Sequence, residues 1–328
     1  MRDPILRVSG LTKNFPVGQR MFGGPKHHLR AVDDVMIDLA PGETLGIVGE
    51  SGCGKTTLGR LVLRLLEPSA GSIEFEGRDI THLSEREMRP IRRHLQAVFQ
   101  DPYSSLNPRM KVRDIIGEPL DNFGYTPQQI TERVEEVMEI VGLPADTMSR
   151  HPHAFSGGQR QRIGIARALA LVPRLIVCDE AVSALDVSIQ AQILNLLVDI
   201  QRQFDLSLIF ISHNLGVIRH VSHRIAVMYL GQIVEFADEN DLFTNPLHPY
   251  TYSLISAVPE PEPESHSDHV PLKGEIPSPV NPPSGCYFHT RCPVAQDRCR
   301  GERPELTQIS PGRQVRCHFP GTLTEVPA

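Results

Sequence analysis

One stretch near the N-terminus has the residue types and the spacing of a phosphate-binding loop. It reads Gly-Glu-Ser-Gly-Cys-Gly-Lys-Thr from Gly49 to Thr56 and directly follows the apolar run 45–48. Glycines let such a loop curl so that backbone N–H groups converge on phosphate oxygens, and the next helix adds its positive end. Lys55 can reach the terminal phosphates of a nucleotide, and the Thr56 hydroxyl can bind Mg²⁺. Because residues 55–66 carry apolar side chains at helical spacing, we expect strand, loop and helix in this order.

A second apolar run, 175–178, ends in two acids, Asp179 and Glu180. Carboxylates at the carboxyl end of a parallel strand lie where α/β proteins bind ligands. We expect Asp179 to hold Mg²⁺, directly or through water, and Glu180 to polarise an attacking water as general base. The alternative is an acidic strand end in a plain turn, which the upstream loop disfavours.

A second helix start could also bind an anion. Ser156 and Gln159 have capping-box spacing at the start of a predicted helix that continues to Leu169. Gly157 and Gly158 remove side chains from its first turn, which leaves N–H groups open to an anion. With two such helix ends and one Lys-Thr pair, the simplest geometry places the second end on a nucleotide bound by a neighbouring chain. The plain alternative is a capped helix without a ligand.

These motifs lie in a chain that alternates strands with helices. A helix is predicted at 190–203 and a helical region at 101–170, within which Thr126 and Pro127 start one helix. Residues 17–30, with a histidine pair, are predicted as a solvated loop. Besides the run at 45–48, strands are predicted over five segments: 5–8, 32–39, 72–77, 175–178 and 206–211. The βαβ order predicts a doubly wound α/β core.

Composition sets limits on partners and location. The 328 residues carry a net charge of −6, and no segment is dominated by Lys or Arg, so no nucleic-acid surface is expected. No run of about 18 apolar residues is present that would span a membrane. The start, Met1 to Pro4, lacks the apolar stretch of a secretion signal. We therefore expect a cytoplasmic protein.

In order and spacing, the motifs resemble those of ABC-transporter ATPases over about residues 4–240. The resemblance implies a P-loop NTPase ABC cassette, with a RecA-like core, an antiparallel β subdomain and a helical subdomain. The matching positions are Gly49–Thr56, Gln100, Ser156–Gln159, Asp179–Glu180, Asp186 at the end of Ser183–Asp186, and His213.

The resemblance also implies a role for each residue. Lys55, Glu180 and His213 would be catalytic, with His213 holding the γ-phosphate and orienting the water. Asp186 would bridge a dimer seam. ATP would contact Phe15, Gly49, Ser51, Gly52, Cys53, Gly54, Lys55, Thr56, Thr57, Gln100 and His213. Mg²⁺ would be bound by Thr56, Gln100 and Asp179. The ATP of the partner chain would meet Ser156, Gly157, Gly158 and Gln159.

Some positions depart from the family's usual pattern. Phe15 stands where tyrosine is commoner, and Phe155 stands where leucine opens the signature. Ala181-Val182 replaces the common Pro-Thr, and Asn214 replaces a frequent aspartate. None of the last three departures touches a catalytic atom, so both halves of the site are expected to work.

The end of the chain narrows the resemblance. Segments 245–251, 277–286 and 291–293 look like the C-terminal extension of oligopeptide/dipeptide-importer ATPases, most similar to the second ATPase of a heteromeric pair. This implies an ATPase domain at 1–258 and a proline-rich strap with a Cys-rich extension at 259–328.

The function implied is ATP hydrolysis that energises import of di- or oligopeptides from the cytoplasmic face of the cell membrane, where the chain would be peripheral. Implied partners are a second, paralogous ATPase subunit, two integral membrane permease subunits and, indirectly, an extracytoplasmic solute-binding protein. The alternatives are a soluble ABC ATPase acting on DNA or ribosomes, an importer of metal chelates or sugars, and a redox- or metal-sensing tail.

Four of the six cysteines lie in the last fifth of the chain, spaced C-x5-C-x6-C-x17-C. Zinc ribbons use shorter gaps between paired ligands, so zinc fits this spacing poorly. By resemblance to the family, Cys286, Cys292, Cys299 and Cys317 would bind a [4Fe–4S] cluster. Zinc, unligated thiols, and His289 or His318 as ligands remain alternatives.

Overall fold

The computed structural model describes residues 3–19, 25–101, 105–257 and 274–323. Outside them lie Met1 and Arg2, residues 20–24 of the predicted loop, residues 102–104 of the predicted helical region, residues 258–273, where the predicted domain boundary and most of the predicted strap fall, and residues 324–328. The described residues form two compact units. The helical unit comprises residues 40–44 and 82–211, and the P-loop unit comprises the described parts of 3–39, 45–81 and 212–323. Among the described residues, no helix has both the length and the apolar character needed to cross a membrane.

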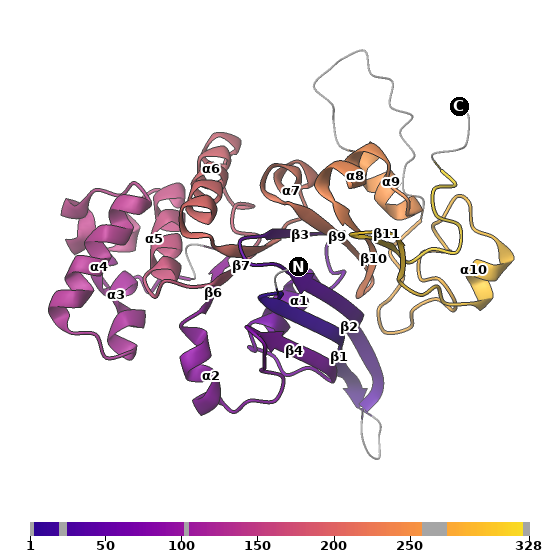
Figure 1. Cartoon of the computed structure of the whole chain (residues 1–328), viewed down its shortest axis with the longest axis horizontal. Coiled ribbons are helices and arrows are strands. Elements are labelled where there is room, and N and C mark those ends of the chain that lie inside the picture. The colour runs from indigo at the N-terminus through magenta and orange to yellow at the C-terminus, as the bar shows by residue number, and fades with distance from the viewer. Residues whose placement is uncertain (1–2, 20–24, 102–104, 258–273, 324–328) are drawn as a thin grey trace, which may run out of the picture. The chain divides into compact units, whose positions relative to one another are not determined.

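The helical unit contains three parallel strands whose order is β8-β7-β6. Helices α3, α4 and α5 pack against one another beside these strands (Figure 1). The predicted helix at 190–203 starts earlier, because Asp186 caps it through the amide of Ile189. The elements are α2 Glu85–Arg92, β6 Leu95–Phe99, α3 Val112–Asn122, α4 Pro127–Ile140, two 3₁₀ turns at Ala145–Ser149 and Pro152–Ala154, α5 Gly157–Leu169, β7 Leu175–Asp179, α6 Val187–Phe204 and β8 Ser207–Ile211.

The P-loop unit contains two groups of strands. One is an antiparallel sheet of order β2-β1-β4-β5, and the other runs β11-β12-β10-β9-β3, with only β9 and β3 parallel. The strands are β1 Leu6–Gln19, β2 Pro25–Leu39, β3 Thr44–Val48, β4 Ala70–Phe75, β5 Arg78–Asp79, β9 Arg224–Tyr229, β10 Gln232–Asp238, β11 Thr307–Ser310 and β12 Arg313–Val315. The helices are α1 Lys55–Val62, α7 Leu215–Val221, α8 Glu239–Thr244, α9 Pro249–Ser256 and α10 Asp297–Gly301.

The predicted loop at 17–30 is wrong for its described residues, 17–19 and 25–30. Strands β1 and β2 continue there as an antiparallel pair that includes Val17 and His27. Their ladder pairs Gln19 with Pro25 at its far end. The strands pair there through backbone hydrogen bonds, which do not require apolar side chains. The sequence therefore shows no apolar alternation that would predict a strand. His27 and His28 lie exposed on this pair of strands.

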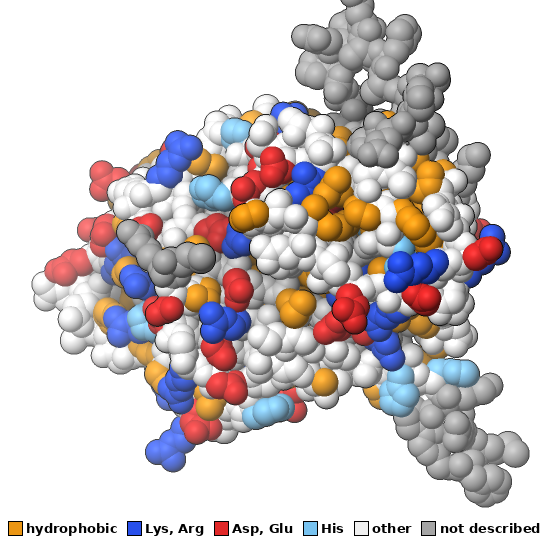
Figure 2. All heavy atoms as spheres, turned by 45° about the vertical axis from the view of Figure 1, so that its right-hand side comes forward, with side chains coloured by type: hydrophobic (Ala, Val, Ile, Leu, Met, Phe, Trp, Pro, Cys, Tyr) orange, Lys and Arg blue, Asp and Glu red, His pale blue; other side chains and the backbone are white. Residues whose placement is uncertain are grey.

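Apolar side chains from both faces of the strands form the core of each unit. In the P-loop unit, Leu6, Leu11 and Leu39 of the antiparallel sheet have no exposed surface. In the helical unit, Val134, Val137 and Met138 form an apolar stripe on α4 and are fully buried. Side chains of both charges are interspersed on the face drawn in Figure 2.

Candidate functional site

The phosphate-binding loop follows a fully buried strand, as predicted. Every residue of β3 is buried, and the strand lies parallel to β9. At Gly49 a Cβ atom would approach the carbonyl oxygen of Met228 to 2.1 Å, and at Gly54 it would approach that of Ala31 to 2.1 Å. Gly54 also has a φ of 108° at the start of α1. Both positions therefore require glycine, because neighbouring backbone lies directly against the loop.

The Lys55 side chain lies inside this loop. Its Nζ atom donates to the carbonyl oxygens of Gly49, at 2.7 Å, and Glu50, at 3.0 Å, and the residue is 5% exposed. Burial raises the pKa of the Cys53 thiol, whose Sγ atom lies 3.8 Å from the same ammonium. A fixed cation and a ring of loop amides are the groups that hold phosphate oxygens.

Glu50, the second residue of the loop, is held by residues far away in sequence. Its backbone N–H donates to Tyr250 Oη at 2.9 Å. Its carboxylate accepts two bonds from Arg291, at 2.7 Å and 3.1 Å, and this hydrogen bonding raises the pKa of Arg291. Tyr229 contacts the same cluster, with the Arg291 guanidinium 5.8 Å from its ring centre. Residues 245–257 and 274–323, called the C-terminal segment below, thus contact the phosphate-binding loop.

His213 is exposed and lies two residues after the end of β8. The preceding residue, Ser212, donates its N–H to the carbonyl oxygen of Ile47 in β3 at 3.1 Å. Asn214 caps α7, its side chain accepting the amide of Val217 at 3.3 Å. Asparagine is as good a cap as the aspartate frequent at this position, which accounts for that departure.

In the helical unit, Gln100 and Asp179 end neighbouring strands. Phe99 pairs with Asp179 in the β6–β7 ladder, so Gln100 follows β6 at the edge where β7 ends. Glu180 has a φ of 51° and donates its N–H to the carbonyl oxygen of Ile211 at 2.9 Å. The sheet therefore brings three predicted site residues, Gln100, Asp179 and Glu180, to one edge of this unit.

The predicted capping box is present at the start of α5. The Gln159 amide donates to Ser156 Oγ at 3.3 Å, and the Ser156 amide donates to Gln159 Oε1 at 3.0 Å. Gly158 has a structural role in addition, because a Cβ there would lie 2.4 Å from the Cγ2 atom of Ile189 in α6. Gly157 has an ordinary contact with Leu185. The backbone N–H groups of Gly157 and Gly158 belong to the first turn of α5, where no carbonyl group within the helix can accept them.

Asp186 is exposed at the start of α6. Hydrogen bonds from the Ile189 amide, at 3.0 Å, and the Ser188 hydroxyl, at 2.8 Å, lower the pKa of its carboxyl. It is therefore ionised over the physiological pH range.

The remaining departures from the family pattern are accommodated locally. Phe155, Ala181 and Val182 are buried, at 6%, 1% and 2% exposed, which suits their apolar side chains. Phe15 is half-buried on β1, and Lys13 Nζ lies 5.2 Å from its ring centre. Ser51 and Gly52 are exposed, whereas Thr56 and Thr57 are half-buried in the first turn of α1.

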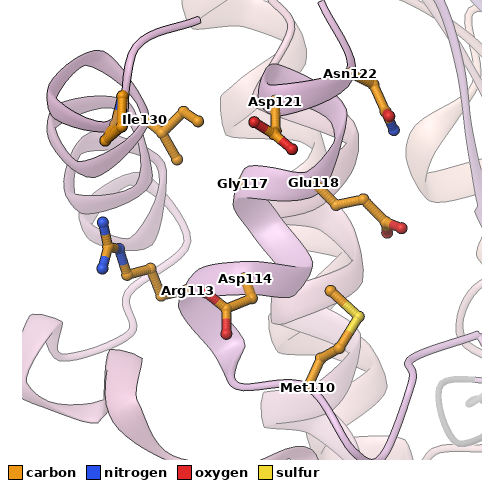
Figure 3. A pocket seen from close by; sticks show the side chains of 9 residues that line it. Met110, Arg113, Asp114, Gly117, Glu118, Asp121, Asn122 and Ile130 are labelled. Carbon is orange, nitrogen blue, oxygen red and sulfur yellow. The ribbon is translucent and has the colours of Figure 1, made fainter. Parts of the chain in front are cut away.

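A hollow of about 440 Å³ opens between α3 and α4 of the helical unit (Figure 3). The glycine at position 117 lets α3 approach α4, since a Cβ there would lie 2.7 Å from Ile130. Asp114, Glu118 and Asp121 contribute carboxylates, against the single cation of Arg113. The full lining is Met110, Arg113, Asp114, Gly117, Glu118, Asp121, Asn122, Pro127 and Ile130.

Two buried carboxylates attach the C-terminal segment to the strands of the P-loop unit. Asp33 accepts bonds from Gln232, Tyr287 and Arg303, at 2.8, 3.1 and 2.8 Å. Burial raises the pKa of Asp33, but the hydrogen bond from Gln232 and the charge of Arg303 outweigh it, so the pKa is lowered.

Glu235 makes the second attachment and has no exposed surface. It accepts the amides of Leu247 and His248, at 2.9 and 2.8 Å, and a bond from Arg313 at 3.3 Å. His248 Nδ1 in turn accepts the Tyr250 amide at 3.0 Å, and burial lowers the pKa of His248 to about 3. Segment 245–251, a family marker in the sequence, thus caps α9 and places Tyr250 on the phosphate-binding loop.

The six cysteines are free thiols. Burial, together with the nearby charges of Cys286 and Cys299, raises the pKa of Cys292 to about 11 and that of Cys317 to about 12. The Cys286 amide donates to the carbonyl oxygen of Cys299 at 2.9 Å. Even so, no group of three or more His, Cys, Asp or Glu side chains is placed to hold a metal ion in the part of the chain that the structure describes. The predicted cluster therefore gains no support from this geometry.

Sequence reasoning missed Glu50, Tyr250 and Arg291 as contacts of the phosphate-binding loop. Glu50 occupies a variable position of the motif, and Arg291 lies 241 residues away. The only available signal was the sequence of segments 245–251 and 291–293, which marks a family but gives no contact.

Comparison with known proteins covers almost the whole chain. Residues 32–183 match the ABC transporter family, and residues 234–299 match the oligopeptide/dipeptide transporter C-terminal region. A probable peptide ABC transporter ATP-binding protein, y4tS of Sinorhizobium fredii, is 54% identical over 97% of this chain and 90% of its own length. The oligopeptide transport ATP-binding protein AppF of Bacillus subtilis is 50% identical over 97% of this chain and 98% of its own.

Solved structures agree on the cassette. The cbiO1 protein of Clostridium perfringens, part of an ABC transporter complex, has a TM-score of 0.64 at 25% identity and covers 74% of this chain and 91% of its own. A dimeric ATP-binding cassette, MJ0796, bound to ADP and phosphate, has a TM-score of 0.63 at 25% identity and covers 71% of this chain and 98% of its own. The chain belongs to the ATP-binding subunits of ABC transporters and carries the C-terminal region found in oligopeptide/dipeptide transporters.

Proposed function

We propose that this chain is the ATP-hydrolysing subunit that drives import of di- or oligopeptides through a membrane transporter, bound peripherally at the cytoplasmic face. The observation that carries this proposal is the match over 97% of the chain to relatives named for peptide and oligopeptide transport, C-terminal region included. A soluble ATPase sharing only the cassette would not need that region.

We assign a proposed role to each predicted nucleotide-binding residue separately. Lys55 and the loop amides hold the phosphates of ATP, and Phe15 stacks on adenine. Thr56, Gln100 and Asp179 are the proposed ligands of Mg²⁺, and their hydroxyl, amide and carboxylate oxygens suit a hard cation. Mg²⁺ supplies charge stabilisation to the phosphoryl group when bound.

Hydrolysis is proposed as in-line attack of water on the γ-phosphate. Glu180 accepts the proton of that water, and His213 orients it against the phosphate. Two observations support this role: the positive φ of Glu180, and the hydrogen bond that its N–H donates to the carbonyl oxygen of Ile211. Together they fix the direction of the backbone at the end of β7. Positioning and charge stabilisation provide most of the catalysis in such reactions.

The signature helix α5 is proposed to act on the nucleotide of a second ATPase subunit. Ser156, Gly157, Gly158 and Gln159 present the first turn of α5, and the exposed carboxylate of Asp186 would bridge the seam of that dimer. A paralogous partner fits the proposed membership of a heteromeric pair.

The hollow between α3 and α4 is the proposed docking site for a membrane permease subunit. Closure and reopening at the nucleotide are proposed to be transmitted to the membrane subunit through segment 100–113, of which residues 102–104 lie outside the described residues. Arg167 of α5 supports this link by donating to the carbonyl oxygen of Ser105 at 2.6 Å. The carboxylates of Asp114, Glu118 and Asp121 favour a permease segment that carries a basic residue.

A [4Fe–4S] cluster on Cys286, Cys292, Cys299 and Cys317 is proposed as a further component. The support is the chemistry of the donor set alone, four thiols between positions 286 and 317, since thiolates are the usual ligands of such clusters. No step of hydrolysis depends on it. Anaerobic purification followed by iron, sulfide and zinc analysis tests it: about four iron atoms per chain are expected, and either stoichiometric zinc or metal-free thiols would reject it.

The transport role is tested by purifying the tagged full-length chain from detergent-solubilised membranes. We expect two integral membrane subunits and a second ATPase to accompany it, and Glu118→Lys to reduce their recovery while the chain stays folded. Asp199→Lys makes the same charge change at an exposed position of α6, away from the hollow, and is the control that should leave recovery unchanged. Recovery of the chain without any integral membrane protein would reject the proposal.

A further inference from the structure

Glu50 is fixed by all three of its polar groups. Its N–H donates to Tyr250 Oη at 2.9 Å, its carbonyl oxygen accepts Lys55 Nζ at 3.0 Å, and its carboxylate accepts both terminal nitrogens of Arg291. The Lys55 bond joins Glu50 to the cation that is expected to meet the phosphates. A displacement of Glu50 therefore changes the position of Lys55 as well.

The contact with Arg291 is shielded from water. The Arg291 side chain is 4% exposed and the Glu50 side chain is 23% exposed, with donor–acceptor distances of 2.7 and 3.1 Å. A bidentate guanidinium–carboxylate pair fixes direction as well as distance, which a lysine could not do. Partial burial limits the screening of this pair by solvent and salt.

Arg291 is itself held in place by the C-terminal segment. Its amide donates to the carbonyl oxygen of Phe288 at 2.9 Å, and the Phe288 ring lies 5.3 Å from that of Tyr229 and 5.5 Å from that of Tyr250. Phe288 is 1% exposed and Tyr250 has no exposed surface. This packing presents a rigid guanidinium to the loop.

We propose that Arg291 is a positioning residue for ATP binding, which sets the phosphate-binding loop through Glu50 and makes nucleotide affinity depend on how the C-terminal segment is docked. The proposal rests on the proposed function of this loop as the ATP site. Arg291 does not touch the reacting atoms, so its effect falls on affinity for nucleotide and much less on turnover at saturation.

The test measures Mg-ATP and Mg-ADP binding by calorimetry, and ATP hydrolysis, on full-length variants. We expect Arg291→Gln to weaken binding about tenfold, a usual size for coupling between sites, while kcat stays within about twofold. Glu50→Gln should weaken binding similarly, and the double variant should be no worse than either single one. Arg291→Lys should lie between wild type and Arg291→Gln.

Arg303→Gln is the matched control. Arg303 also comes from the C-terminal segment and also bonds a buried carboxylate at 2.8 Å, but that carboxylate is Asp33 of β2 and not a residue of the loop. We expect this control to lose thermal stability without losing nucleotide affinity. Should Arg291→Gln fail to fold, Tyr250→Phe removes only the acceptor of the Glu50 amide and should weaken binding by itself.

The outcomes separate the two proposals. If wild type binds ATP, Lys55→Ala abolishes binding, and the Arg291, Glu50 and Tyr250 variants all bind like wild type, the positioning role is rejected and the ATP site stands. Equal weakening by Arg303→Gln and Arg291→Gln would also reject it, because general loosening of the segment would then explain both. If wild type binds no ATP, the proposed function itself fails.

Discussion

Phe288→Ala is predicted to detach the C-terminal segment from the P-loop unit. Phe288 is 1% exposed, and its ring packs against Tyr229, Tyr250 and His248 at centre distances of 5.3, 5.5 and 5.6 Å. Truncating a buried phenylalanine costs roughly 3–5 kcal/mol through lost burial and the cavity that remains. If that cost falls on docking of the segment, the undocked population rises roughly 10²- to 10⁴-fold, since each 1.4 kcal/mol is about a factor of ten.

Limited proteolysis of the full-length chain measures that population, because cleavage follows the fraction of open molecules when opening is fast. Phe288→Leu keeps most of the volume and should cost about 1 kcal/mol, so its cleavage rate should rise only several-fold. Ile309→Ala removes a side chain that is 49% exposed on β11 of the same segment and should change little. Cleavage of Phe288→Ala at the wild-type rate would refute the anchoring role of this ring.

Three further predictions concern other parts of the chain. Glu180→Gln should bind ATP but hydrolyse it slower by roughly 10²–10⁴, the usual contribution of a positioned general base, and near-normal turnover in a phosphate-release assay would overturn its role. Burial lowers the pKa of His248 to about 3, below the unfolded value near 6.5, so the unfolded chain binds the proton first and stability is lost as the pH falls from about 6.5 towards 3. At pH 5 this loss is about 2 kcal/mol; chemical denaturation at pH 7.5 and 5 should show it in wild type but not in His248→Asn, and equal pH dependence in both would contradict it. Gly158→Ala places a Cβ 2.4 Å from Ile189 and should destabilise the chain by roughly 1–3 kcal/mol, recovered in part by Ile189→Ala in thermal denaturation; a Gly158→Ala variant as stable as wild type would show that α6 yields without cost.

The local parts of the nucleotide site could be predicted from sequence because each rests on neighbouring residues. The loop at 49–56 combines a buried strand, glycines and a helix start, and the capping boxes at Ser156 and Thr126 each lie within four residues. The acids after β7 follow from a strand whose apolar residues are continuous. Such signals need no knowledge of the tertiary structure.

The contacts of the C-terminal segment could not be predicted in this way. The pair of Glu50 with Arg291 and that of Asp33 with Arg303 join residues more than 200 positions apart, and a single charged residue carries no periodic signal. Gly158 illustrates a different limit: its exposed amide could be predicted, whereas the close approach of Ile189 depends on how α5 and α6 pack. The extension of the β1–β2 hairpin through Val17 and His27 was missed for want of apolar alternation.

ATP-driven peptide uptake tests the central claim most directly. Proteoliposomes that contain this chain with its partner ATPase and permease subunits are loaded with Mg-ATP on the side of the ATPases, and uptake of a labelled oligopeptide is followed in the presence of the solute-binding protein. The account predicts uptake that requires ATP and is lost with Glu180→Gln. Uptake that continues unchanged with Glu180→Gln, or ATP hydrolysis by wild type that moves no peptide, would contradict it.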